Sequence, residues 1–264
     1  MLQIRFRAVN AWVRSVDQRQ TTFLIGFLLS TLGSSLTNIA LAYQYLLRPT
    51  GVEQYAILMY GATLTAIIGA SYFGSQADRL GRYDRSLLFL NLICAATSAA
   101  LACSPPFPLV VVLVIASTAL SLWNAIIVRK LVPQFFSGGA LRRVTAWLTE
   151  VAAIGAIFGP LLGPIFPVFG INLSAMFAID ALMLAITGFI YWRCFRSSKA
   201  PKELVNLQPY RGIFASLRDS TRLARNRTLR PLIAAYVPYS LGISSLFFTL
   251  ALFNKHIAEG DEIA

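Results

Sequence analysis

The sequence lacks charge over long stretches. Only 13% of its 264 residues are charged, and Asp, Glu, Lys and Arg are absent from residues 20–47, 54–77, 86–128 and 231–254. A helix of about 20 residues crosses the hydrocarbon core of a bilayer, and soluble core helices rarely stay uncharged for longer. These gaps exclude an ordinary soluble domain and predict an all-α integral membrane protein.

The sequence is also poor in the residues that build metal and catalytic sites. It has one histidine, His256, and three cysteines without metal-ligand spacing, Cys94, Cys103 and Cys194. An odd, scattered set of this kind predicts neither a disulfide framework nor a zinc site. There is no phosphate-cradling Gly-Lys loop for ATP. We therefore expect no metal, no cofactor and no enzymatic activity.

The uncharged stretches set the expected organisation. The run 86–128 is long enough for two crossings, with residues 104–108 as a proline-rich turn. We expect seven membrane-spanning helices at roughly residues 22–47, 54–77, 86–104, 108–128, 146–168, 171–192 and 231–254. The corresponding parts are an amphipathic segment 1–21, a six-helix bundle 22–192, a basic linker 193–230, and a seventh helix with a short tail, 231–264.

The basic residues are distributed asymmetrically between the two sides of this arrangement. Of the 23 Lys and Arg residues, only Arg48 and Lys255 fall on the side opposite the N-terminus. By the positive-inside rule the N-terminus and the linker 193–230 are cytoplasmic, in the plasma membrane of a bacterium. Because this sidedness accounts for most of the net charge of +12, we expect no nucleic-acid partner.

A motif of glycines, an aspartate and arginines lies in the loop after the second predicted helix. Its residues are Gly74, Asp78, Arg79, Gly81, Arg82 and Arg85. Here the chain resembles the major facilitator superfamily, whose loop at this place reads Gly-x-x-x-Asp-Arg-x-Gly-Arg. The resemblance implies a cytoplasmic latch between the two halves of a transporter. Glycines let backbones approach closely, and Asp78 suits a facing helix N-terminus.

A second motif lies in the fifth predicted helix. Gly155, Gly159 and Gly163 follow one another at four-residue spacing, and Pro160 follows Gly159. Alone, this spacing predicts a helix-packing face. In the fifth helix it resembles the antiporter motif of the same superfamily and implies an exporter, and residues 128–133 resemble macrolide-efflux and enterobactin-exporter relatives. Residues 108–128 contain no arginine, unlike many drug/proton antiporters.

The resemblance implies twelve helices, about five more than we expect here. We therefore expect either a fragment or truncated product, or a half that assembles with another chain.

Polar residues at helical spacing mark a path. In this family helices one, four and seven line the central cavity. The candidate lining residues are Ser30, Ser34, Thr37, Asn38, Ser117, Ser121, Asn124, Tyr236 and Tyr239. Polar faces within apolar helices point to protein or water rather than lipid. The alternative is that the hydroxyls bond back to the preceding turn.

Two acidic residues are candidates for proton coupling. Asp180 lies near the middle of the sixth predicted helix, where a charge costs about 2.5–3.5 kcal/mol on insertion scales. Glu150 lies nearer the cytoplasmic end of the fifth helix, where Arg142 and Arg143 are candidate partners. The sequence as a whole predicts a secondary transporter that exports a small drug- or siderophore-like molecule against protons by alternating access. The alternative is a non-transporting membrane protein or an accessory half-transporter.

Overall fold

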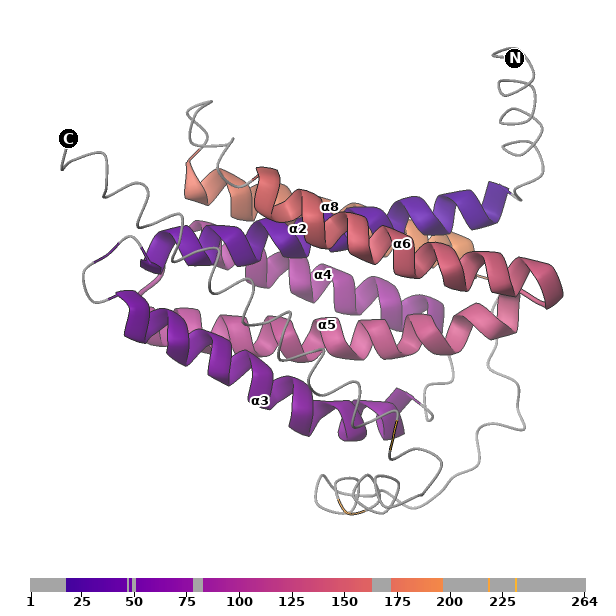
Figure 1. Cartoon of the computed structure of the whole chain (residues 1–264), viewed down its shortest axis with the longest axis horizontal. Coiled ribbons are helices and arrows are strands. Elements are labelled where there is room, and N and C mark those ends of the chain that lie inside the picture. The colour runs from indigo at the N-terminus through magenta and orange to yellow at the C-terminus, as the bar shows by residue number, and fades with distance from the viewer. Residues whose placement is uncertain are drawn as a thin grey trace, which may run out of the picture.

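The chain folds into long helices that lie side by side, as a computed structural model shows (Figure 1). The structure describes residues 18–46, 48, 51–77, 83–162, 172–196, 218 and 231. Its helices are α2 (Gln18–Leu46), α3 (Gly51–Ala77), α4 (Tyr83–Ala102), α5 (Phe107–Phe135), α6 (Gly138–Leu162) and α8 (Leu173–Phe195). They correspond to the first six predicted spans. The seventh, 231–254, lies almost wholly outside the described residues.

Proline and glycine set the turns between consecutive helices. α4 ends at Ala102 and α5 begins at Phe107, with Pro106 as its N-cap residue. The intervening Ser104 has a positive φ of 50°. This confirms the turn predicted at residues 104–108.

The connection between α5 and α6 is much shorter than the sequence predicted. Residues 129–145 were expected to form a cytoplasmic loop, but α5 continues to Phe135 and α6 begins at Gly138. Only Phe136 and Ser137 separate them, and Gly138 has a φ of 55°, which glycine adopts without strain. The prediction was wrong because charge marks where a helix leaves the hydrocarbon, while the helix itself continues into the aqueous layer.

The helices pack in a repeating pattern. α2 contacts α6 and α8, and α5 contacts α3 and α4, while α4 and α8 pack against each other. If α2, α3 and α4 form one set and α5, α6 and α8 the next, the first helix of each set packs against the second and third helices of the other. This is the arrangement expected of two structural repeats within one transporter bundle.

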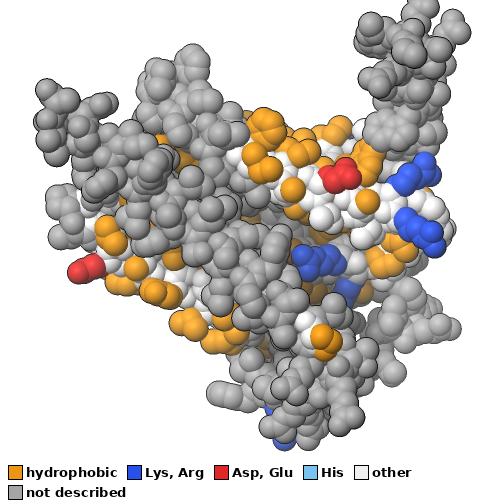
Figure 2. All heavy atoms as spheres, viewed as in Figure 1, with side chains coloured by type: hydrophobic (Ala, Val, Ile, Leu, Met, Phe, Trp, Pro, Cys, Tyr) orange, Lys and Arg blue, Asp and Glu red, His pale blue; other side chains and the backbone are white. Residues whose placement is uncertain are grey.

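The surface of the bundle is apolar, as a bilayer requires. Tyr60, Leu64 and Ile67 on α3 are 57–72% exposed, and hydrophobic side chains gather along this helix (Figure 2). Four of the described helices, α2, α4, α5 and α8, are long and apolar enough to cross a membrane by length and composition. Exposed apolar surface of this extent is typical of contact with lipid.

Charge collects at one end of the bundle. The end where α5 meets α6 carries Lys and Arg side chains (Figure 2). Among the described residues from 18 to 196, Arg48 alone of the basic residues lies at the opposite end, between α2 and α3. The structure thus reproduces the asymmetry on which the predicted orientation depends, and the orientation itself stays a prediction.

Glycine allows α6 to approach α2. A Cβ atom at Gly155 would lie 2.9 Å from both Cβ and Oγ1 of Thr31. The Ser35 hydroxyl donates across the same contact to the Gly155 carbonyl oxygen, at 3.0 Å. Close packing of this kind replaces the hydrophobic driving force that lipid cannot supply.

We predict that Gly155→Ala lowers the free energy of unfolding in detergent, by about 1–3 kcal/mol, because the added methyl group overpacks this contact. Gly139→Ala, in the same helix, is the matched control, since a Cβ there would meet nothing within 4 Å. That control should be neutral or slightly stabilising. Equal thermal midpoints for the two variants would contradict the packing role of Gly155.

Candidate functional site

A carboxyl group lies buried where three helices meet. Asp180, near the middle of α8, is only 2% exposed. Its Oδ2 accepts a hydrogen bond from Thr37 Oγ1 on α2 at 2.6 Å and another from Ser98 Oγ on α4 at 2.5 Å. One side chain therefore joins helices from both repeats.

A glycine makes room for this carboxyl group. Asp180 Oδ1 lies against Gly33 on α2, where any Cβ atom would collide with it. Among the described residues Oδ1 has no hydrogen-bond partner. The two oxygens thus differ, since Oδ2 is held by two hydroxyls and Oδ1 faces backbone.

This geometry makes the Asp180 site sensitive to a proton. An ionised carboxylate only accepts hydrogen bonds, whereas a protonated one also donates. Two hydroxyl donors on one oxygen suit the ionised form, and protonation of Oδ2 would require one of them to turn. A proton on Oδ2 would therefore change the hydrogen bonds from α2 and α4, whereas a proton on Oδ1 would leave both of them in place.

Glu150, the other acidic candidate, has a different environment. Its side chain is exposed on α6. Because α6 begins at Gly138, Arg142 and Arg143 lie about two helical turns from Glu150, or about 10 Å along the axis, too far for a direct ion pair. Neither arginine forms an ion pair with it in the described part of the chain.

The predicted lining residues of α2 differ in exposure. Ser34 and Asn38 are exposed, while Ser30 and Thr37 are half-buried. Thr37 donates to Asp180, whereas Ser30, Ser34 and Asn38 have no hydrogen-bond partner among the described residues. Ser34 and Asn38 are therefore the most accessible members of this group.

The predicted stripe on α5 faces α4 over part of its length. Asn124 and Asn91 of α4 exchange two hydrogen bonds through their side-chain amides, at 3.2 and 3.3 Å. Ser121 Oγ of α5 lies 3.9 Å from Cys94 Sγ of α4. Ser117, one turn earlier, is half-buried. These contacts give Ser121 and Asn124 partners inside the bundle.

Sequence reasoning missed the partners on α4. Asn91, Cys94 and Ser98 recur at three- and four-residue spacing within the longest uncharged run. A search for polar residues at helical spacing, which found the stripes on α2 and α5, would also have found this stripe on α4. Asn91 is fully buried and Ser98 is 1% exposed.

The loop motif is described only at its two ends. Gly74 lies in the last turn of α3, and its carbonyl oxygen accepts a hydrogen bond from Lys130 Nζ of α5 at 3.0 Å. The four last carbonyl groups of a helix lack partners within it, and lysine is a suitable cap. Arg85 is exposed on the first turn of α4. Asp78, Arg79, Gly81 and Arg82 lie outside the described residues.

The α6 motif is likewise only partly described. Gly155 packs against α2 as described above, and Gly159 and Pro160 lie within α6. Gly163, Tyr236 and Tyr239 lie outside the described residues.

The fold defines a class of protein, a multi-pass helical membrane protein built from two three-helix repeats with a buried polar centre. A family model of the Major Facilitator Superfamily matches residues 23–260, which is most of the chain. The chain therefore belongs to the Major Facilitator Superfamily. A search of curated proteins found no match.

This membership confirms several of the predictions from sequence. The chain is an all-helical, multi-pass membrane protein of a transporter family whose members bind small molecules in the membrane, and it is not an enzyme. The exporter subfamily, the substrate, the coupling ion and the orientation stay predictions.

We predict that the Asn91–Asn124 pair stabilises the bundle cooperatively. Asn91→Leu leaves the Asn124 amide without its partner, and Asn124→Leu leaves Asn91 Oδ1 without its donor, although Asn91 Nδ2 still donates to the Leu87 carbonyl oxygen at 2.7 Å. The double variant removes both amides at similar volume. The double variant should therefore lose less stability than the two single variants together, by about 0.6 kcal/mol and at most about 1.7 kcal/mol. Unfolding titrations with a denaturing detergent measure all four proteins. Strictly additive losses would show that the two amides act independently.

Proposed function

We propose that this chain is a secondary transporter that exports a small molecule across the plasma membrane in exchange for protons, by alternating access. The observation that carries the proposal is the Asp180 carboxyl group, buried in α8 and held by Thr37 of α2 and Ser98 of α4. A carboxyl group buried in a membrane bundle is costly, and such residues mark proton relays and substrate pathways.

The proposed coupling works through helix packing. In this proposal the proton binds at Asp180 Oδ2, where it changes which group donates in the contacts with α2 and α4. α2 also carries the exposed Ser34 and Asn38. A proton bound at Asp180 thereby alters the position of a helix whose exposed face contacts the solute, which is the link that exchange of solute for protons requires.

The proposed solute is a small amphiphile, drug-like or siderophore-like. The resemblance of residues 128–133 to macrolide and enterobactin exporters supports this class. The exposed part of the α2 stripe supports it as well, because Ser34 and Asn38 offer hydrogen bonds without a fixed charge. The N-terminus is cytoplasmic in this proposal, as the distribution of arginine predicts.

An accessory half-transporter is the second candidate. The described helices form one six-helix bundle, and alternating access requires two bundles that rock about a shared site. In that case the chain transports only when it is paired with another bundle.

We predict that Asp180→Asn abolishes proton-driven accumulation but preserves exchange. The amide keeps the size of the carboxyl group and cannot release a proton. In everted membrane vesicles energised to be acidic inside, radiolabelled erythromycin should accumulate with the native protein. Accumulation should fall to the level of empty vesicles in the variant, while exchange of internal for external erythromycin continues at a similar rate.

Two controls complete this experiment. Glu150→Gln should accumulate erythromycin like the native protein, since Glu150 is exposed on α6. Enterobactin serves as the second probe if erythromycin is not a substrate. Native accumulation that persists in Asp180→Asn would contradict the coupling role, and absence of transport of both probes by the native chain alone would favour the half-transporter.

A further inference from the structure

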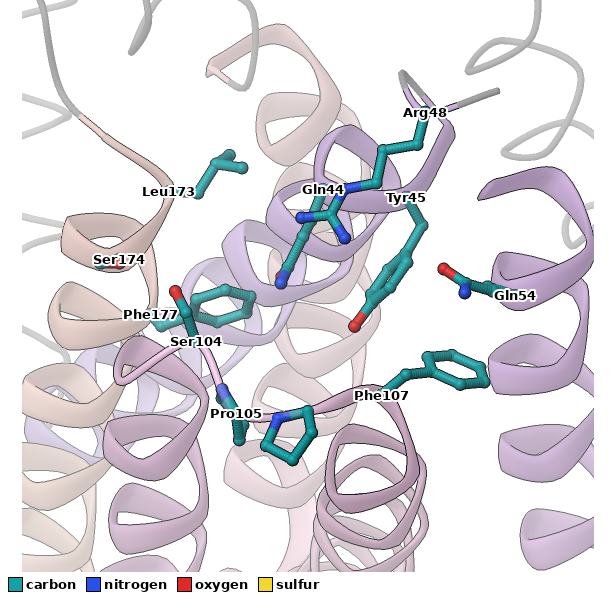
Figure 3. A pocket seen from close by; sticks show the side chains of 11 residues that line it. Gln44, Tyr45, Arg48, Gln54, Ser104, Pro105, Phe107, Leu173, Ser174 and Phe177 are labelled. Carbon is teal, nitrogen blue, oxygen red and sulfur yellow. The ribbon is translucent and has the colours of Figure 1, made fainter. Parts of the chain in front are cut away.

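A small cavity opens at the end of the bundle opposite the loop motif. Its volume is about 280 Å³, and its walls come from the end of α2, the start of α3, the turn between α4 and α5, and the start of α8 (Figure 3). The residues that define its chemistry are Gln44, Tyr45, Arg48, Gln54, Ser104 and Phe177. The cavity is separate from the Asp180 carboxyl group, which is buried deeper between the helices.

Arg48 supplies the charge of this cavity. Its guanidinium group lies 5.7 Å from the centre of the Tyr45 ring, and the Tyr45 ring packs edge-on against Phe107 with centroids 5.6 Å apart. This stacking orients a planar cation that otherwise has considerable rotamer freedom. No carboxylate lies within ion-pair distance of Arg48 in the part of the chain that the structure describes, so its charge is available to a ligand.

Uncharged hydrogen-bonding groups accompany the guanidinium group. Gln44 lies in the last turn of α2, shortly before Arg48, and Gln54 reaches the cavity from α3 (Figure 3). Ser104 contributes a hydroxyl from the turn before α5, while Phe107 and Phe177 form apolar walls. An arginine fork with flanking amides matches the two oxygens of a carboxylate or the oxygens of a phosphate. The apolar walls match a short hydrocarbon or aromatic body attached to that anion.

The volume limits the size of the ligand. Sites for drug-sized molecules usually measure about 300–1,000 Å³. At about 280 Å³ this cavity has room for a small organic molecule, or for one group of a larger molecule, and not for a whole macrolide.

We propose that this cavity is a binding site for a small organic anion, with Arg48 holding its carboxylate or phosphate group. Two sources supply that chemistry, a free solute and the headgroup of an anionic lipid. The site does not depend on the proposed export reaction, because it requires neither Asp180 nor a proton gradient.

The test uses the full chain in nanodiscs of phosphatidylcholine. Equilibrium dialysis measures how much radiolabelled benzoate it binds. We expect saturable binding that inorganic phosphate competes away. Arg48→Gln should weaken it by about tenfold or more, the effect of losing a charge-assisted hydrogen bond. Ser174→Phe should weaken it similarly by filling the cavity, since Ser174 lines it from the start of α8. Arg143→Gln, which removes an exposed arginine from the other end of the bundle, should have no effect.

Thermal melting of each variant establishes that it is folded, and Gln54→Leu replaces Ser174→Phe if the larger side chain is not accommodated. A second set of measurements decides whether the natural anion is a free solute or a lipid headgroup. Benzoate binding is measured in nanodiscs that contain phosphatidylglycerol, in salt that screens surface charge. Weaker benzoate binding there identifies a lipid headgroup as the natural occupant, and unchanged binding identifies a free solute. Absence of saturable binding, or native affinity in Arg48→Gln, would overturn the proposal. Neither result depends on the transport measurement with Asp180→Asn.

Discussion

The structure depends on one constraint, that a polar group left without a partner in hydrocarbon is costly. Helices satisfy the backbone by themselves, so the constraint falls on polar side chains within the spans. Thr37 and Ser98 supply partners to Asp180 Oδ2, and the side-chain amides of Asn91 and Asn124 bond each other. α4 is the common element, because it supplies Ser98 to α8 and Asn91 to α5. The polar contacts therefore tie the two three-helix sets together at their junction.

Small residues make these contacts geometrically feasible. In lipid, helix association depends on close packing because apolar surface has little preference for another helix over acyl chains. Gly26 and Gly33 on α2 lie against α8, and Gly188 of α8 lies against Asn91 of α4. Gly26 also offers its carbonyl oxygen to the hydroxyl of Thr187 on α8. The glycines thus bring backbones near enough for short side chains to bond across the interface.

Much of the architecture could be predicted from the sequence, since the cost of charge in hydrocarbon is large and local. The uncharged runs located α2, α3, α4, α5 and the turn before Phe107, while the apolar patterns around Glu150 and Asp180 located α6 and α8. They failed at the ends of α5 and α6, because Arg129 and Arg143 mark the edge of the membrane and not the end of a helix.

The partners inside the bundle were beyond this reasoning. Asp180 was recognised as an unusual intramembrane acid, but its contact with Thr37 joins residues 143 positions apart. Such a contact depends on how α2 and α8 cross, which no local pattern encodes. The stripe Ser117, Ser121 and Asn124 shows the same difficulty, because periodicity identifies a polar face without saying whether a neighbouring helix or a solute covers it.

The seam between α2 and α8 links the two polar regions of the molecule. Thr37 and Gln44 lie seven residues apart on one face of α2, and Arg48 follows just beyond the end of this helix. On α8, Phe177 precedes Asp180 by three residues, about 4.5 Å along the axis, and Phe177 lines the cavity of Arg48. A shift of α2 against α8 large enough to break the bond between Thr37 and Asp180 therefore also moves the walls of that cavity. Since both helices contribute to both regions, a relative movement of α2 and α8 would be felt in both.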